Sequence, residues 1–158
     1  MDGLNRFLQT FFNLDVAARY WPDILYGMGI TAGLGVAVSI TGLSLGLALA
    51  IIRSMQYNWF SLPIVIFVDI MRALPPLVII IIFFFAFPLI GLEMSAITAT
   101  WLSLSMVLAA YAEESIWGGI LSLPRGQSEA ARSTGLSWWQ TMTAVILPQA
   151  VRIALPPL

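Results

Sequence analysis

The feature that most constrains this chain is an apolar run from Tyr26 to Ile52 that contains no charged residue and ends at Arg53. At about 1.5 Å per residue, a helix of that length exceeds the ~20 residues needed to cross the hydrocarbon core of a bilayer. Further apolar runs follow at 62–90 and 96–123. The sequence therefore predicts three transmembrane spans, at about 26–52, 62–90 and 96–123, in an all-α, polytopic transmembrane helical bundle.

The composition supports a lipid environment and excludes several functions. Hydrophobic residues make up 59% of the chain and charged residues only 9%, whereas soluble domains carry about 25% charged residues. The net charge of -1 disfavours nucleic acid as a partner. Cysteine and histidine are absent, and no Gly-rich phosphate loop occurs. We therefore expect no enzymatic activity, no metal and no cofactor in this chain.

Arginines in short loops predict the orientation of the chain. Arg53 follows the first run, and Arg125 and Arg132 follow the third. This places the 124–148 loop in the cytoplasm and the N-terminus outside. Segment 1–25 is then an extracytoplasmic amphipathic segment, since its apolar residues recur at helical spacing.

The 124–148 loop is polar and is predicted to form two short helices joined at a glycine. The first covers Gln127 to Thr134 with Ser128 as a cap, and Gly135 ends it with a positive φ. The second covers 138–146 and is stopped by Pro148. The residues alone fit either a docking element or an ordinary interfacial loop.

Glycine pairs in the first run, Gly29 with Gly33 and Gly42 with Gly46, are spaced to allow another helix to pack closely.

The last third of the chain resembles the polar amino acid uptake permeases of ABC transporters, which carry an EAA loop. The residues that carry the resemblance are Ala109-Ala110-Tyr111, Glu114, Gly118-Gly119-Ile120, Pro124, Gly126-Gln127, Glu129-Ala130-Ala131, Gly135-Leu136, Gln140, Leu147-Pro148-Gln149-Ala150, Arg152 and 155–158. Upstream, 69–77 looks like a weaker version of the family's Arg-Gly-Thr-Pro-Leu segment.

The resemblance implies an ABC importer type I permease that works with several partners. These are cytoplasmic ABC ATPase subunits, a second permease subunit in a homo- or heterodimer, a periplasmic solute-binding protein, a small polar amino acid substrate and membrane lipid. The residues that would couple to the ATPase are Gly126, Glu129, Ala130, Ala131, Gly135, Leu147 and Pro148.

The chain departs from the family pattern in three places. Trp117 stands where the family usually has arginine, and Ala73-Leu74 replace glycine and threonine. The family also continues past the ending of this chain. We expect 149–158 to be the start of an incomplete fourth span, with the C-terminal helices missing.

Charged and proline residues inside the predicted spans are candidates for the substrate path: Arg72, Pro75, Glu113 and Glu114. Charge at such depth costs several kcal/mol unless it is paired or faces water. Arg72 could pair with Glu113 or Glu114 across helices, pair with Asp69 on its own helix, or contact substrate directly. Pro75-Pro76 should kink or break the second span, and the sequence slightly favours a simple kink.

Together these features predict a multi-pass permease subunit of an ATP-driven ABC importer for polar amino acids in the bacterial inner membrane. ATP hydrolysis is expected in a partner subunit. The alternatives are an importer of another small solute and a truncated, non-transporting membrane fragment or scaffold.

Overall fold

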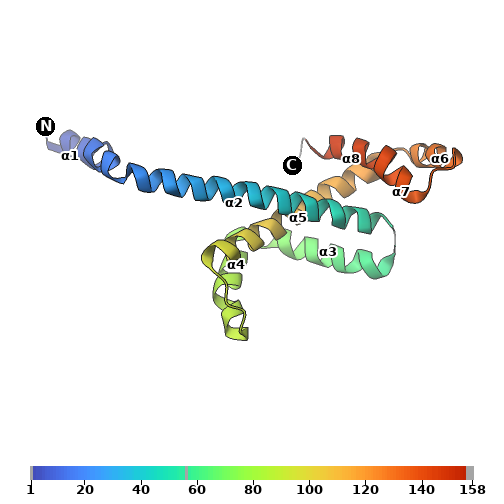
Figure 1. The fold of residues 1–158 in the computed structure, drawn as a ribbon, viewed down its shortest axis with the longest axis horizontal. Coiled ribbons are helices and arrows are strands. Elements are labelled where there is room, and N and C mark those ends of the chain that lie inside the picture. Colours follow the sequence, from blue (N-terminus) through green and yellow to red (C-terminus); the bar gives the residue numbers. More distant parts are fainter. Residues whose placement is uncertain (1, 56, 156–158) are drawn as a thin grey trace. The chain divides into compact units, whose positions relative to one another are not determined.

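The computed structural model describes residues 2–55 and 57–155, in which every regular element is helical (Figure 1). The chain divides into two compact units, Met1–Val36 and Ala37–Leu158. The boundary falls inside the long helix α2, Leu14–Ser54.

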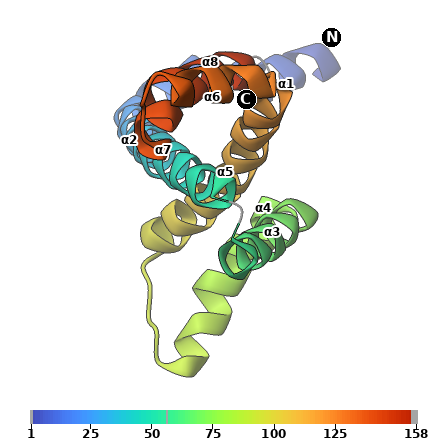
Figure 2. The same cartoon turned by 90° about the vertical axis from the view of Figure 1, so that its right-hand side faces the viewer.

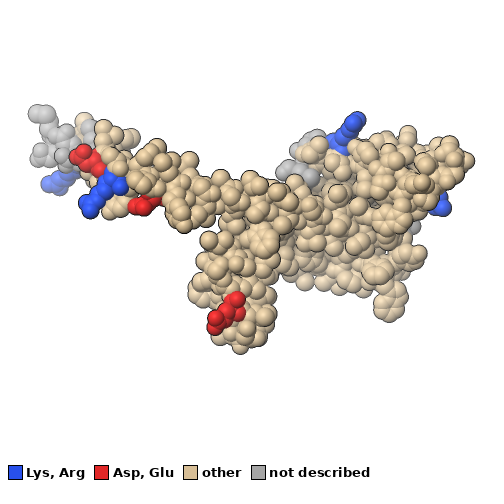
Figure 3. All heavy atoms as spheres, viewed as in Figure 1, with Lys and Arg blue, Asp and Glu red and all other residues tan. Residues whose placement is uncertain are grey.

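The first unit contains α1, Asp2–Phe11, and the beginning of α2. The Asn13 side chain caps α2, because its Oδ1 accepts hydrogen bonds from the backbone N–H groups of Asp15 and Val16, each at 3.1 Å. Helix α2 therefore begins well before the predicted span at 26–52, and residues 14–25 continue into that span without a break in the helix. On the face drawn in Figure 3, charged atoms gather over α1 and the first turns of α2.

In the second unit, α2 packs closely on α5, Ala96–Ser122, through two glycines. A Cβ at Gly42 would lie 2.9 Å from the Leu108 side chain, and one at Gly46 would lie 2.6 Å from Ala112 Cβ. The close packing predicted for this glycine pair is confirmed. Because 42 faces 108 and 46 faces 112, the two helices run in the same direction (Figure 1).

The segment between α2 and α5 is broken rather than kinked. Helix α3, Asn58–Ala73, ends before Leu74 and Pro75, and α4, Pro76–Ile81, begins after them. The bend between the two parts is 104°, so the simple kink favoured by the sequence is wrong. Leu74 is extended (φ -96°, ψ 136°), since a residue before proline is driven out of the helical region, and two consecutive prolines remove two backbone donors.

The broken segment continues beyond α4 as the π-helical turn η1, Ile82–Ala86, and the 3₁₀ turn η2, Phe87–Ile90. Gly91 ends it with a φ of 83°.

Helix α5 is the central element of the second unit, with α3 and α4 on one side and α8 on the other (Figure 2). Ile64 and Val68 of α3 pack with Ala110 of α5 in one cluster. On the opposite side a Cβ at Gly119 would lie 2.5 Å from the backbone oxygen of Ala150 in α8. The close approaches of α2 and α8 to α5 therefore depend on small residues that let helix backbones come together.

Two of the described helices, α2 and α5, are long and apolar enough to cross a membrane. The bent pair Asn58–Ala73 and Pro76–Ile90 adds a third crossing if it forms one broken span.

Candidate functional site

Helix α6, Arg125–Ser133, forms the first half of the polar loop predicted at 124–148. The N-cap residue of α6 is Pro124, which makes no side-chain capping hydrogen bond. Ser128 lies inside the helix, so the cap predicted at Ser128 is wrong. The Pro124 carbonyl accepts a hydrogen bond from the Gln127 N–H at 3.0 Å, in the first turn of α6. Gly135 has a φ of 92°, which confirms the predicted glycine stop.

The second half of the loop begins with a capping box and does not stop at Pro148. Ser137 Oγ accepts a hydrogen bond from the Gln140 backbone N–H at 3.3 Å, and Gln140 Oε1 accepts one from the Ser137 N–H at 2.8 Å. After α7, Trp138–Thr141, the chain continues through the π-helical turn η3, Met142–Ile146, into α8, Leu147–Ala154.

Pro148 therefore starts a helix, contrary to the prediction that it ends one. It lies in the first turn of α8, where a missing N–H costs little. The wider turn before it, closed by the Leu147 N–H on the Met142 oxygen, relieves the clash that a proline makes with the preceding turn.

The structure separates the predicted coupling residues into two groups. Gly126, Glu129 and Ala130 are exposed on α6, Ala131 is half-buried there, and Gly135 follows in the turn. Leu147 and Pro148 are at the start of α8, and Leu147 packs against a buried cluster of Ala50, Ile116 and Ala154. The first group can contact a partner, whereas Leu147 holds the loop to the spans. Of 149–158, α8 carries residues up to Ala154, and 156–158 lie outside the described residues.

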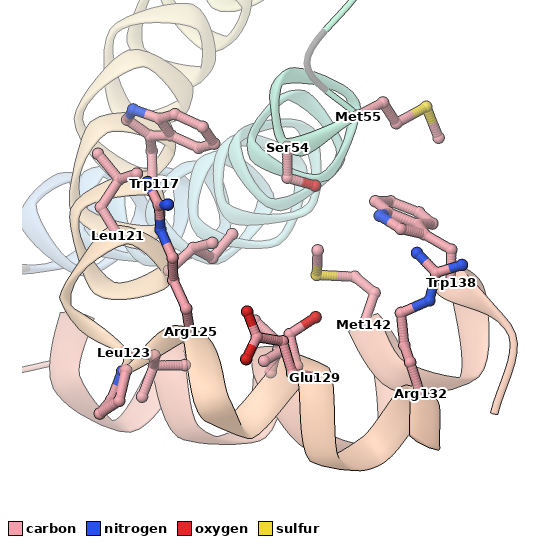
Figure 4. Close-up of a pocket in the computed structure, with 14 residues that line it drawn as sticks. Ser54, Met55, Trp117, Leu121, Leu123, Arg125, Glu129, Arg132, Trp138 and Met142 are labelled. Atoms are coloured by element: carbon pink, nitrogen blue, oxygen red, sulfur yellow. The ribbon is translucent and has the colours of Figure 1, made fainter. Parts of the chain in front are cut away.

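A partly enclosed pocket of about 700 Å³ lies on one side of α6 (Figure 4). Helix α6 contributes Arg125, Ser128, Glu129 and Arg132, which the i, i+3, i+4 and i+7 spacing puts on one face. The rest of the lining comes from the ends of α2 and α5 and from α7 and η3: Ser54, Met55, Trp117, Ile120, Leu121, Leu123, Pro124, Trp138, Met142 and Ile146.

A cluster of four charges joins α2, α3 and α5. Arg53 Nη1 donates hydrogen bonds to both oxygens of Glu113 at 3.1 Å and lies 3.5 Å from Glu114 Oε2. Arg72 Nη1 lies 3.5 Å from the same Glu114 oxygen. The cross-helix pairing predicted for Arg72 is thus confirmed with Glu114, and no Asp69–Arg72 pair forms among the described residues.

The cluster is buried at one end and open at the other. The Glu113 side chain is 0% exposed, whereas the side chains of Arg72 and Glu114 are 38% and 42% exposed. Each arginine also lies over an aromatic ring, Arg53 over Trp117 at 4.8 Å and Arg72 over Tyr111 at 5.6 Å. Four charges that sum to zero lower the cost of placing them together in a low-dielectric region.

Arg53 is the residue that the sequence reasoning missed, because it was used only to orient the chain. The available signal was its position at the end of one apolar run, at a depth close to that of two glutamates in another.

The predicted path residue Pro75 follows Arg72 by three residues, just after the end of α3. The structure thus brings Arg72, Glu113 and Glu114 together, and Pro75 marks the adjacent break in the helix. A second polar contact missed by the sequence joins α2 to α5: Thr41 Oγ1 lies 2.6 Å from Ser105 Oγ and accepts a hydrogen bond from Trp101 Nε1 at 3.2 Å. Within the part of the chain that the structure describes, no three His, Cys, Asp or Glu residues are grouped to hold a metal.

Comparison with known proteins finds related sequences over most of the chain. Residues 29–158 match the family described as binding-protein-dependent transport system inner membrane component. The chain is 41% identical, over 95% of its length, to the probable amino-acid ABC transporter permease protein YckA of Bacillus subtilis strain 168. It is 33% identical, over 90% of its length, to the L-cystine transport system permease protein TcyB of the same organism.

A solved structure shares the arrangement of the helices. The chain superposes on an amino acid ABC transporter crystallised with histidines with a TM-score of 0.77 and 29% sequence identity, covering 90% of this chain and 66% of that one. The chain spans 66% of the length of YckA and 61% of the length of TcyB.

The helices and these matches define an all-α, polytopic membrane protein of the ABC importer permease type. The chain belongs to the family of binding-protein-dependent transport system inner membrane components. The resemblance to the amino acid permeases of ABC transporters is confirmed by these relatives.

Proposed function

We propose that the chain is the permease subunit of an ATP-driven importer for a polar amino acid, and that α6 docks on a separate ATPase subunit. The observation that carries the docking role is the slim, exposed helix α6 between Pro124 and Gly135. Its small residues Gly126 and Ala130 leave an outer face without bulky side chains. Such a helix fits into a cleft of a partner protein. ATP hydrolysis is assigned to that partner.

The same proposal accounts for the direction of the helices. Parallel α2 and α5 require the intervening segment, 58–90, to return across the bilayer, which supports a broken second span. Arginines at the shared ends of α2 and α5 favour the cytoplasm for that side and the outside for the N-terminus. The protein then lies in the bacterial inner membrane as a multi-pass subunit.

Transport would follow a shift between conformations. Closure of two ATPase subunits would draw together the α6 helices of two permease subunits, in a homo- or heterodimer, and change which side the path opens to. A periplasmic solute-binding protein would deliver the substrate. Arg72, Glu113 and Glu114, beside the break at Pro75, are the candidates for the path, because Arg72 and Glu114 are partly exposed.

Co-purification tests the docking role. The permease complex carrying Glu129→Gln or Gly135→Val should retain less ATPase subunit than the unaltered complex. The matched control is Glu93→Gln, since Glu93 lies in the connection before α5, at the opposite end of that helix from α6. Equal retention in all variants would remove the docking assignment.

The solute class needs a second measurement. Candidate solute-binding proteins, each loaded with its ligand, should stimulate ATP hydrolysis by the reconstituted complex when they match the permease. Stimulation only by binding proteins for a different solute class would favour the alternative, an importer of another small solute.

A further inference from the structure

Helix α2 is longer than a bilayer crossing requires. Its 41 residues extend for about 62 Å at 1.5 Å per residue, whereas the hydrocarbon core is about 30 Å thick. The predicted span at 26–52 leaves residues 14–25 at the start of the helix outside the hydrocarbon, and α1 precedes them. This N-terminal part therefore either projects into water or lies along the surface of the bilayer.

Helix α1 has an apolar face and a polar face. Leu4, Phe7 and Phe11 follow the i, i+3, i+7 spacing of one helix face, and Arg6 and Thr10 lie away from it. The rings of Phe7 and Phe11 lie 4.9 Å apart, and all five side chains are exposed. A helix this short is marginal in water unless its apolar face is packed. Helix α1 therefore needs an apolar surface, and the described part of the chain leaves that face open.

The first turns of α2 repeat the same division. Asp15, Arg19 and Asp23 recur every fourth residue and form a charged stripe along the helix. Leu14 and Trp21 lie on the other side and are 81% and 56% exposed. Tryptophan is the residue type that gathers at the boundary between lipid and water. This part of α2 is thus suited to a surface that is apolar on one side and wet on the other.

A proline lies between this segment and the span. Pro22 is on the same side of α2 as the charged stripe. Because a proline ring clashes with the preceding turn, a helix opens on the proline side and bends toward the opposite side. A bend at Pro22 therefore turns α2 toward its apolar side. For a segment whose apolar side rests on a bilayer, that direction leads from the surface into the hydrocarbon.

We infer that α1 and residues 14–25 form a surface anchor, which lies in the headgroup layer of a phospholipid bilayer with its apolar face toward the acyl chains. The two arginines, Arg6 and Arg19, are balanced by Asp15 and Asp23. Binding therefore depends on burial of apolar side chains and needs no anionic lipid. The inference requires that α2 crosses the membrane, and it is independent of the docking of α6 on an ATPase.

The continuity of α2 favours lipid over a protein as the occupant of the apolar face. The helix runs without a break from residues 14–25 into the span, so the surface anchor is always held beside the bilayer. A solute-binding protein that binds and leaves would expose the same apolar face to water whenever it is absent.

The test is site-specific fluorescence quenching, which is simple because the chain contains no cysteine. The full chain is reconstituted in phosphatidylcholine vesicles without a solute-binding protein, and one introduced cysteine carries an environment-sensitive dye. Leu4→Cys and Ala17→Cys place the dye on the apolar side, and Thr10→Cys and Arg19→Cys are the matched controls on the polar side. The quenchers are iodide in water and a lipid with a nitroxide near its headgroup. We expect the lipid nitroxide to quench the apolar-side labels at least about threefold more than the controls, and iodide to show the reverse order.

Two further variants separate the surface anchor from the rest of the protein. Ile40→Cys, at an exposed site within the α2 span, reports insertion and should be quenched by a nitroxide near the end of the acyl chain. Phe7→Ser with Phe11→Ser should lower lipid quenching of the Leu4→Cys label. The same double change should leave the Ile40→Cys signal and the retention of the ATPase subunit as they are.

Three results would overturn the inference. Iodide that quenches the apolar-side labels as strongly as the controls would show that the segment projects into water. Labels that neither quencher reaches would show a protein cover, such as a second copy of the chain. Lipid quenching that requires added phosphatidylglycerol would show that charge and not apolar burial drives binding. With the Ile40→Cys signal and ATPase retention intact, each of these results leaves the proposed function in place.

Discussion

Arg53 at the end of α2 donates two hydrogen bonds of 3.1 Å to the carboxylate of Glu113, which is fully buried in α5. The pair joins two helices that otherwise meet through glycine and alanine. The Arg53–Glu113 pair lies at one end of a chain of charges that passes through Glu114 to Arg72 on α3. The contact of Arg72 with Glu114 thereby ties the end of α3, just before the helix break, to α5. Helix α6 is the next helix along the chain after α5.

Removing the charge of Glu113 should destabilise the fold more than removing that of Glu114. Glu113→Gln leaves the guanidinium of Arg53, whose side chain is only 16% exposed, without its main partner, at a cost of about 2 kcal/mol. Glu114→Gln alters a side chain that is 42% exposed, so its cost should stay below about 1 kcal/mol. Thermal unfolding in detergent, followed by tryptophan fluorescence, measures both. Equal losses would contradict the assignment of Glu113 as the buried anchor.

Exchanging the charges of Arg72 and Glu114 should restore part of the stability that either single change removes. Arg72→Glu and Glu114→Arg each place like charges together, whereas the double variant re-forms an opposite pair between the same two positions, which lie 3.5 Å apart in the unaltered protein. Recovery should be incomplete, because an arginine at 114 also faces Arg53. The yield of monodisperse protein in detergent is the measurement. A double variant no better than the worse single variant would mean that the pair contributes nothing.

Two neighbouring glycines should respond very differently to alanine. A Cβ at Gly119 would lie 2.5 Å from the Ala150 oxygen, and one at Gly118 would meet nothing within 4 Å. Gly119→Ala should therefore separate α5 from α8 and lower the melting temperature. Gly118→Ala should be neutral or gain up to about 1 kcal/mol, because alanine favours the helix. A similar melting temperature for both variants would show that α5 and α8 do not pack as described.

The turn after α6 should tolerate glycine or asparagine at position 135 better than other residues. Gly135 has a φ of 92° and an open surrounding, so Gly135→Val should cost about 1 kcal/mol or more through backbone strain alone. Gly126→Ala, within α6 and also without a neighbour in reach, is the control and should stabilise that helix. Limited proteolysis reports the difference as faster cleavage near residue 135. Unchanged cleavage in the valine variant would remove the requirement for a positive φ.

The sequence predicted the end of α6 because its cause is local: Gly135 ends the helix through its own backbone freedom. It also located the disruption at Pro75-Pro76, where two donors are missing, but it favoured a kink where the structure has a break of 104°. The same reasoning failed at Pro148. Whether proline ends a helix or begins the next one depends on the turn before it, and the wide turn η3 is held by packing of Met142 and Ile146.

The long apolar runs determined by themselves that this chain is a helical membrane protein, because a bilayer satisfies no backbone hydrogen bonds and helices satisfy their own. The residues of the polar loop determined its family. Only the tertiary structure decided which charges meet, since Arg53 and Glu113 are sixty residues apart and their pairing depends on the register of α2 against α5. Only the tertiary structure, too, turned three separate arginine and glutamate positions on α6 into one wall of a pocket, because the opposite wall comes from other helices.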